Sequence, residues 1–538
     1  MDFPPVPIMS HQFLIPDART CAAENWNKDQ KLISSFGDEF FQARSFDTNT
    51  NAFDQTRFGV LTVETPAKND LIRTDQINHW VLNLDRSGSM DDLCNDGKTK
   101  LQHLKHTLKN LVHYLKSITN STNHNFLSVI IFDHEAETIC EHIDLNDENS
   151  ENIYTTYIDS IESRGATNFE NAFDHYNNLI SKYPNNESAI HLFMTDGMIT
   201  CGNYNSTYLI NKQNEGANPL SHIYFIGFGI DHNAKLLQEF TNEINSANYY
   251  FIESLENAGL VYGEIVHEII YECLHTITIH VDNGEIYNYL TNTWEHSLSI
   301  ASLPFEASKN YHIRSPWILS NTTPLERSFK ATIVATRPIF NNATQRYNET
   351  LINMHSHYKF IPIENYPNKD VEKFWWRQST LELLYIAKTE YNNDRHTLRS
   401  KLTTFLDNMK AWSNARDFDA DSFVQDLCDD IYATIKGIST ANAYSTIGYT
   451  YINARQSSQG LQRAYNIRDF SHLERSTSTS TQVSTHIPSL SRHTSYASQT
   501  QRDIMRSVSE SASQIYSRPR TGIPVNLYVD ENNKTQEY

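Results

Sequence analysis

The sequence predicts an α/β protein with a doubly wound, mostly parallel sheet, followed by a small β-rich domain, a helical region and a Ser/Thr-rich tail. Three observations lead to this prediction. Short, almost wholly apolar runs alternate with amphipathic segments between about 57 and 273, strict apolar–polar alternation begins after Cys273, and long helical periodicity begins near Lys369. Apolar strands that alternate with helices are typical of a sheet covered on both faces.

Within the first region, a set of apolar runs is expected to form the sheet: His79–Leu84, Phe126–Phe132, Ala189–Met194, His222–Phe228 and Tyr249–Ile252. Leucines at helical spacing predict a helix over Leu101–Leu115, and Asn168–Ile180 and Leu255–Cys273 are expected to be helices as well. The short segment Thr138–Glu141 follows the second strand closely and is expected to be an antiparallel edge strand.

After Cys273 the apolar period changes from helical to alternating. Thr276–Val281 alternates strictly and precedes the turn signal Asp282-Asn283-Gly284. Further strands are expected at Glu295–Ala301, Phe329–Thr336 and Tyr358–Ile363. Three helices are expected next, at Lys369–Tyr391, Arg395–Ala415 and Ser422–Lys436.

These patterns divide the chain into an N-terminal arm (1–56), the α/β domain (57–273, core 78–273), a β-rich domain (274–366), a helical region (367–469) and a tail (470–538). The tail is dominated by Ser and Thr, which predicts disorder except for a short helix near Gln501–Val508. In the helical region, Trp375 and Trp376 are expected to anchor a core or a domain contact, with a ligand platform as the alternative.

The composition excludes several classes of function. The chain has 44 Lys and Arg against 64 Asp and Glu, a formal charge of −20, so it lacks the basic surplus that generic binding of nucleic acid or anionic membranes needs. No apolar run approaches the ~18 residues of a membrane-spanning helix. Residues 1–7 have neither the basic nor the apolar region typical of a signal peptide, so none is expected, and the six cysteines are scattered without a C-x-x-C pair. We therefore expect an intracellular, cytoplasmic protein with free thiols, either alone or in a large particle.

Oxygen-bearing side chains follow several of the predicted strands. Asp85-Arg86-Ser87-Gly88-Ser89 comes directly after the first strand, Thr167 precedes a predicted helix, and Thr195-Asp196-Gly197 ends a later strand. Because the carboxyl ends of parallel strands meet at one sheet edge, these residues are expected to converge there. Two carboxylates and three hydroxyls suit a hard divalent cation such as Mg²⁺. A lone Asp-x-Ser-x-Ser run is otherwise explained as a helix cap.

No other motif predicts catalysis. The chain has no G-x-x-x-x-G-K-[ST] loop, no H-E-x-x-H and no G-x-S-x-G. His103 and His106 lie off the apolar stripe of their helix and are expected to face solvent. We therefore expect the protein not to be an enzyme.

The strand-end residues resemble the metal-ion-dependent adhesion site (MIDAS) of von Willebrand factor type A (VWA) domains. All five positions of that motif are matched: Asp85, Ser87, Ser89, Thr167 and Asp196. The resemblance covers about 78–273 and implies that Mg²⁺ or Mn²⁺ is held by the hydroxyls, with Asp196 acting through water. One departure is Arg164-Gly165-Ala166, where many members carry two glycines.

The resemblance implies a cation-dependent protein–protein interaction in which an Asp or Glu of a partner completes the ion's coordination. Two alternatives stay open: a structural or assembly component with a metal-free VWA domain, and an adaptor of a ubiquitin-ligase or other enzyme complex. The following regions resemble intracellular VWA proteins, some of which carry a RING finger. Six dispersed cysteines do not provide the two zinc sites of a RING, so ligase activity is not expected.

Overall fold

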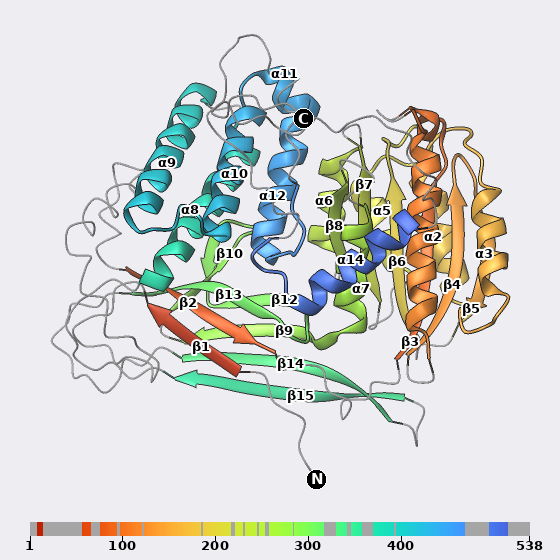
Figure 1. Ribbon diagram of the computed structural model, residues 1–538, viewed down its shortest axis with the longest axis horizontal. Helices are drawn as coiled ribbons and strands as arrows, with labels where there is room; N and C mark the ends of the chain where they lie inside the picture. The colour runs from red at the N-terminus through yellow and green to blue at the C-terminus, as the bar shows by residue number, and fades with distance from the viewer. Residues whose placement is uncertain are drawn as a thin grey trace, which may run out of the picture.

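The structure is a computed structural model in which an α/β domain, a pair of antiparallel sheets and a group of C-terminal helices pack together (Figure 1). It describes residues 8–13, 56–65, 76–93, 97–120, 123–183, 187–216, 221–229, 232–244, 247–252, 258–282, 284–316, 330–341, 346–357, 369–391, 394–467 and 494–514. Across these residues, no helix is both long enough and apolar enough to cross a membrane.

The α/β domain contains a six-stranded sheet in the order β5-β4-β3-β6-β7-β8. Its strands are β3 (Gln76–Asp85), β4 (Asn123–Phe132), β5 (Ala136–Asp144), β6 (Ser188–Thr195), β7 (His222–Phe228) and β8 (Ala247–Ile252). All neighbours are parallel except β5, which pairs antiparallel with β4 at the edge. The predicted strands and the antiparallel edge are thus confirmed.

Helices cover both faces of this sheet. One face carries α2 (Lys100–Ile118), α3 (Ser150–Asp159) and α7 (Ala258–Ile270), and the other carries α4 (Phe169–Ile180), α5 (Ser206–Asn214) and α6 (Ala234–Glu243). The predicted doubly wound α/β fold is therefore present. The expected helix Leu255–Cys273 ends early, at Ile270, because Glu272 already begins the next strand.

Two antiparallel sheets share a second hydrophobic core. One has the order β1-β2-β13-β10-β11 and the other β12-β9-β14-β15. Their strands are β1 (Ile8–Phe13), β2 (Thr56–Glu64), β9 (Glu272–Asp282), β10 (Glu285–Asn288), β11 (Thr293–Glu295), β12 (Ser297–Pro304), β13 (Ser308–Pro316), β14 (Lys330–Asn341) and β15 (Arg346–His357). Residues 57–64, which the sequence analysis included at the start of the α/β domain, belong to β2, and β2 pairs with β13 along its whole length.

One predicted strand of this region is divided. The expected strand Glu295–Ala301 is split between two strands: β11 ends at Glu295, and β12 begins at Ser297. The break occurs because the chain passes from one sheet to the other at His296. The main chain of His296 accepts a hydrogen bond from Val281 N–H at 2.8 Å, which fixes the crossing. The prediction at Tyr358–Ile363 lies outside the described residues.

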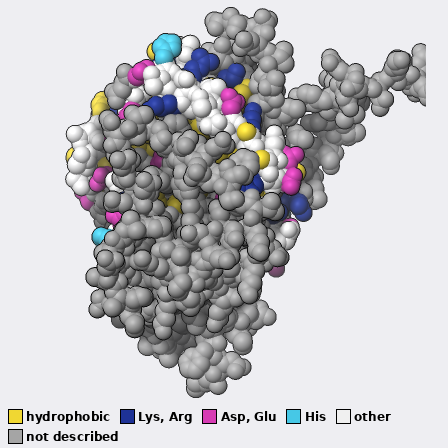
Figure 2. Space-filling view, turned by 90° about the vertical axis from the view of Figure 1, so that its left-hand side faces the viewer, with side chains coloured by type: hydrophobic (Ala, Val, Ile, Leu, Met, Phe, Trp, Pro, Cys, Tyr) yellow, Lys and Arg dark blue, Asp and Glu magenta, His cyan; other side chains and the backbone are white. Residues whose placement is uncertain are grey.

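The C-terminal helices are α8 (Lys369–Thr389), α9 (Arg395–Ala415), α10 (Ser422–Gly437), α11 (Ala441–Ala443), η5 (Tyr444–Gly448), α12 (Tyr449–Leu461) and α14 (Gln499–Gln514). Trp375 and Trp376 on α8 are 0% and 2% exposed, so they are core residues as expected. On the outer side of α9, basic and acidic side chains are interspersed (Figure 2).

Helix α14 contains the helix expected near Gln501–Val508, and it returns to the α/β domain. It lies across α7 and α2 (Figure 1). The contact is close because α7 presents two glycines: a Cβ on Gly263 would lie 2.5 Å from the Cα of Met505, and one on Gly259 would lie 2.8 Å from the Cα of Ser509. Larger residues at these two positions would push α14 away.

Candidate functional site

The strand-end residues meet at the carboxyl edge of the six-stranded sheet. Asp85 is the last residue of β3, and Asp196 directly follows the neighbouring strand β6. Both carboxylates are buried, at 0% and 1% exposure. Thr167 lies in the loop that leads into α4 and is 3% exposed. The parallel register of β3 and β6 thus brings together residues that are far apart in the sequence.

Short contacts link the oxygens of these residues. Ser89 Oγ donates to Asp196 Oδ1 at 2.8 Å, and Ser87 Oγ lies 3.2 Å from Ser89 Oγ. Asp85 Oδ1 accepts a hydrogen bond from Ser87 N–H at 2.8 Å, while its Oδ2 accepts one from Thr195 Oγ1 at 2.6 Å. Since Asp85 uses both oxygens within the protein, it is held rigidly behind the two serines.

Thr167 borders the same space as Ser89. A Cβ placed on Gly197 would lie 3.5 Å from Ser89 Oγ and 3.7 Å from Thr167 Oγ1, so both hydroxyls border the same small space. Thr167 is held there by its own backbone, whose N–H donates to Thr200 Oγ1 at 2.7 Å. The absence of a side chain at Gly197 keeps this space open.

The alternative explanation of the motif, a helix cap, does not apply to Ser87. Ser87 precedes a short 3-10 helix, η2 (Gly88–Asp91), but its side chain makes no capping hydrogen bond. The hydroxyl of Ser87 faces Ser89 Oγ instead. Both hydroxyls are therefore directed toward the oxygen group rather than toward a helix terminus.

A buried carboxylate that the sequence analysis missed supports these loops. Asp133, which follows β4 and is 0% exposed, accepts hydrogen bonds from the Nε atoms of Arg86 and Arg164 at 2.9 and 2.8 Å. Arg86 belongs to the motif itself, and Arg164 belongs to the loop of Thr167. The loop also depends on Gly165, which has φ +73° and accepts from Gly88 N–H at 3.1 Å. A carboxylate directly after a predicted strand was the signal that could have identified Asp133.

A lysine side chain also enters the site. Lys100, the first residue of α2, places Nζ 2.7 Å from Asp196 Oδ2 and 3.1 Å from Asp92 Oδ2. The start of α2 is fixed by a capping box in which Thr99 and Gln102 exchange hydrogen bonds. Burial opposes the charge of Lys100, but its contacts with Asp196 and Asp92 outweigh burial and raise its pKa. The sequence offered no sign of this contact because it depends on how α2 meets the sheet.

The electrostatics of the site favour a cation. Burial, together with the nearby Asp196 carboxylate, raises the pKa of Asp85 to about 6. The site has two buried carboxylates and three hydroxyl oxygens, and the one ammonium group, from Lys100, contacts Asp196. This donor set fits Mg²⁺ or Mn²⁺, both of which prefer oxygen ligands. The residues present could therefore hold a divalent ion if Lys100 moved to its second partner, Asp92.

Exposed apolar side chains occur in the segments that follow β3 and β6. Leu93, Met198 and Tyr204 are 72%, 58% and 62% exposed, and all three belong to the loops at this edge of the sheet. Large apolar residues grouped around a polar centre are typical of protein-binding surfaces.

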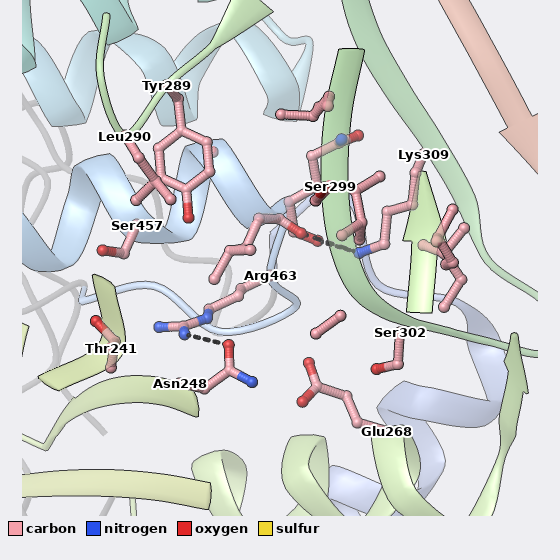
Figure 3. Close-up of a pocket in the computed structure, with 18 of the residues that line it drawn as sticks. Thr241, Asn248, Glu268, Tyr289, Leu290, Ser299, Ser302, Lys309, Ser457 and Arg463 are labelled. Atoms are coloured by element: carbon pink, nitrogen blue, oxygen red, sulfur yellow. Dashed lines mark hydrogen bonds between the residues drawn. The ribbon is translucent and has the colours of Figure 1, made fainter. Parts of the chain in front are cut away.

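A cavity of about 1000 Å³ lies apart from this site, between the α/β domain, the antiparallel sheets and α12 (Figure 3). Two of its cationic side chains bond to the main chain. Lys309 Nζ donates to the main-chain oxygen of Gln462 at 2.7 Å, and Arg463 Nη1 donates to Tyr249 O at 2.6 Å. These bonds attach the segment after α12 to strand β13 of the antiparallel sheets and to strand β8 of the α/β domain.

Comparisons with known proteins point to the same domain as the geometry. Residues 80–198 match the family model of the von Willebrand factor type A domain. No curated protein matches the sequence.

Among solved structures, the fold is similar to a von Willebrand factor type A protein from Catenulispora acidiphila, with 11% identity, a TM-score of 0.49, and coverage of 86% of this chain and 98% of that one. It is similar to the ArnB paralog VWA2 from Sulfolobus acidocaldarius, with 12% identity, a TM-score of 0.43, and coverage of 84% and 97%. Proximal thread matrix protein 1 from the mussel byssus, whose MIDAS motif is zinc-occupied, is 18% identical with a TM-score of 0.30 over 40% of this chain and 50% of that one.

Proposed function

Because residues 80–198 form a von Willebrand factor type A domain, we propose that this chain is a non-enzymatic interaction protein that grips a partner through a divalent cation. The cation would be Mg²⁺ or Mn²⁺, held by Ser87, Ser89 and Thr167 and balanced by Asp85 and Asp196. The observation that supports the proposal is that Ser89 Oγ contacts both Ser87 Oγ and Asp196 Oδ1, and borders the space over Gly197 together with Thr167 Oγ1.

The partner group is proposed to be an Asp or Glu carboxylate. Hydroxyl ligands donate weakly, so an ion held by them remains electrophilic and favours an anionic ligand at an open position. The chain carries a net charge of −20, so an acidic partner needs a local cation to overcome the general repulsion. The exposed side chains of Leu93, Met198 and Tyr204 would then contact apolar neighbours of that acid.

A second candidate function follows from Lys100. Its ammonium group already neutralises Asp196, so the domain could serve as a structural part of an assembly without any ion. Binding of Mn²⁺ by the full chain separates the two functions. A folded chain that takes up no Mn²⁺ supports the structural alternative, and saturable uptake that is lost in Asp85→Ala supports the cation-dependent function.

The partner chemistry is tested with the immobilised full chain and a displayed peptide library. Peptides are selected in Mg²⁺ and retested in EDTA, on Asp85→Ala, and on the control Asp174→Ala, whose carboxylate pairs with Lys212 far from the motif. We expect the selected peptides to contain Asp or Glu and to be lost in EDTA and on Asp85→Ala only. Selected peptides that bind equally after Asp and Glu are changed to Asn and Gln would contradict the proposal.

A further inference from the structure

A second cluster of ligand-type side chains lies at the opposite end of the same sheet. His79 on β3, His142 on β5 and Glu187, just before β6, place their ligand atoms within 4.8 Å of one another. Glu187 Oε2 is 3.1 Å from His142 Nε2 and 3.6 Å from His79 Nδ1. His79 is six residues before Asp85 on one strand, which separates the two ends by roughly 20 Å at ~3.3 Å per residue.

The central histidine of this cluster is buried and incompletely bonded. His79 is 1% exposed, and its Nε2 lies 2.8 Å from Ser128 Oγ. Its Nδ1 has no hydrogen-bond partner within the described part of the chain, although it faces Glu187. If Nε2 carries the proton that Ser128 accepts, Nδ1 presents a bare lone pair toward a carboxylate. A cation between Nδ1 and Glu187 would satisfy both groups.

His142 is brought to the cluster by an irregular stretch of β5. The pairing of β4 with β5 shifts register around Val129, and His142 has a positive φ of +49°. Positive φ is uncommon for a residue with a side chain, and bulges often redirect side chains near functional sites. The imidazole is held by stacking between Phe126 and Tyr183, each with ring centroids 4.1 Å away.

The spacing of these atoms suits a small transition-metal ion. Zinc bonds of about 2.0–2.2 Å in tetrahedral geometry place neighbouring ligand atoms about 3.3–3.6 Å apart, close to the 3.1 and 3.6 Å that separate Glu187 Oε2 from the two imidazole nitrogens. Two imidazoles and one carboxylate are ligands that zinc accepts, whereas Mg²⁺ prefers oxygen. The side chain of His142 is 21% exposed, so the cluster is in contact with solvent at this residue.

We propose that His79 Nδ1, His142 Nε2 and Glu187 bind a zinc-class ion, with a water or an external ligand in the fourth position. This site is separate from the oxygen site at the carboxyl edge, and it does not depend on the proposed function. The ion would tie the edge strand β5 and the segment before β6 to the central strand β3.

The test is zinc binding by the full chain after removal of metal with EDTA. Zinc is titrated against a chromophoric chelator, and Co²⁺ is added as a spectroscopic probe of nitrogen ligation. Two backgrounds exclude binding at the carboxyl edge: Asp85→Ala, and the unmodified chain in excess Mg²⁺. The second background keeps the test valid if Asp85→Ala does not fold.

The ligand variants are His142→Asn, whose residue type tolerates positive φ, and Glu187→Gln. The control is His113→Asn, which removes an exposed histidine 3.4 Å from Glu151. We expect one zinc per chain in both backgrounds and in the control. Each ligand variant should weaken zinc at least about 100-fold, since loss of even an outer-shell partner costs 10–100-fold, and should abolish the Co²⁺ bands. Unchanged zinc affinity in folded ligand variants, or no zinc binding in either background, would overturn the proposal.

Discussion

Replacing Lys100 by Met tests whether a tethered ammonium competes with a divalent ion. Lys100 Nζ lies 2.7 Å from Asp196 Oδ2, and the side chain is 15% exposed. Met keeps most of the aliphatic stem and removes the charge. An ion at this site must displace Lys100 from Asp196, and Asp92, at 3.1 Å, can receive it.

The cost of that displacement sets the size of the effect. A hydrogen bond to a charged group is worth about 1.5–3 kcal/mol, and about 1.4 kcal/mol corresponds to a factor of ten. Part of the cost is returned by the remaining contact with Asp92. We therefore expect Lys100→Met to bind Mn²⁺ roughly ten- to hundredfold more tightly than the unmodified chain.

Calorimetric titration with Mn²⁺ at constant ionic strength measures this change. The control is Lys109→Met, which removes a lysine of the same helix that pairs with Asp159 away from the site. The control should bind Mn²⁺ as the unmodified chain does. Equal or weaker Mn²⁺ affinity in Lys100→Met would refute the competition.

Three further predictions concern stability. Burial lowers the pKa of His191 to about 3, so the folded state resists its protonation, and the free energy of unfolding should fall by up to about 1.4 kcal/mol per pH unit below pH ~6.5. His191→Phe, which keeps the stack on Tyr176, should flatten this part of the urea-denaturation pH profile, and an unchanged profile would contradict the assignment. Gly263→Leu should expose the segment around Met505 to proteases in limited digestion, because its side chain meets that backbone; an unchanged digestion pattern would count against the close contact. Asp133→Asn should lower the unfolding free energy by about 1–3 kcal/mol in urea, because it removes the buried carboxylate that Arg86 and the half-exposed Arg164 share, while Arg86 keeps its contact with Glu137; an unchanged unfolding free energy would show that the shared carboxylate is not structural.

The sheet of the α/β domain could be predicted because its strands are buried on both faces. Segments such as Phe126–Phe132 and Ala189–Met194 are nearly continuous apolar runs, which are typical of strands in a parallel sheet covered on both faces. Helix α2 could be predicted because its leucines face one core. By contrast, helix α5 was not predicted. Its buried residues are Leu209 and Gln213, so its sequence has little apolar periodicity at helical spacing.

The antiparallel sheets could be predicted only in part. Strict alternation identified the middle of β9, because one face of that strand is buried. The pairing of β2 with β13 joins segments about 250 residues apart, and alternation along a strand does not say which strand lies beside it.

Some residues of the candidate site could likewise be predicted from the sequence, and others could not. Its five oxygen-bearing residues could be predicted because they directly follow strands or precede a helix in a known order. The role of Lys100 could not be predicted from the sequence, because its contact with Asp196 depends on where α2 begins relative to the sheet. His79, His142 and Glu187 were missed because they lie on separate elements with no shared spacing, and a bulge positions one of them.

The most direct test of the central claim is anomalous X-ray diffraction from crystals of the full chain grown with Mn²⁺. We predict a single strong peak at the carboxyl edge of the six-stranded sheet, within bonding distance of the Ser87 and Ser89 hydroxyls, with Lys100 turned from Asp196 toward Asp92. The claim that the chain binds its partner through a cation would be contradicted if crystals with saturating Mn²⁺ showed no peak at that point and kept the Lys100–Asp196 contact.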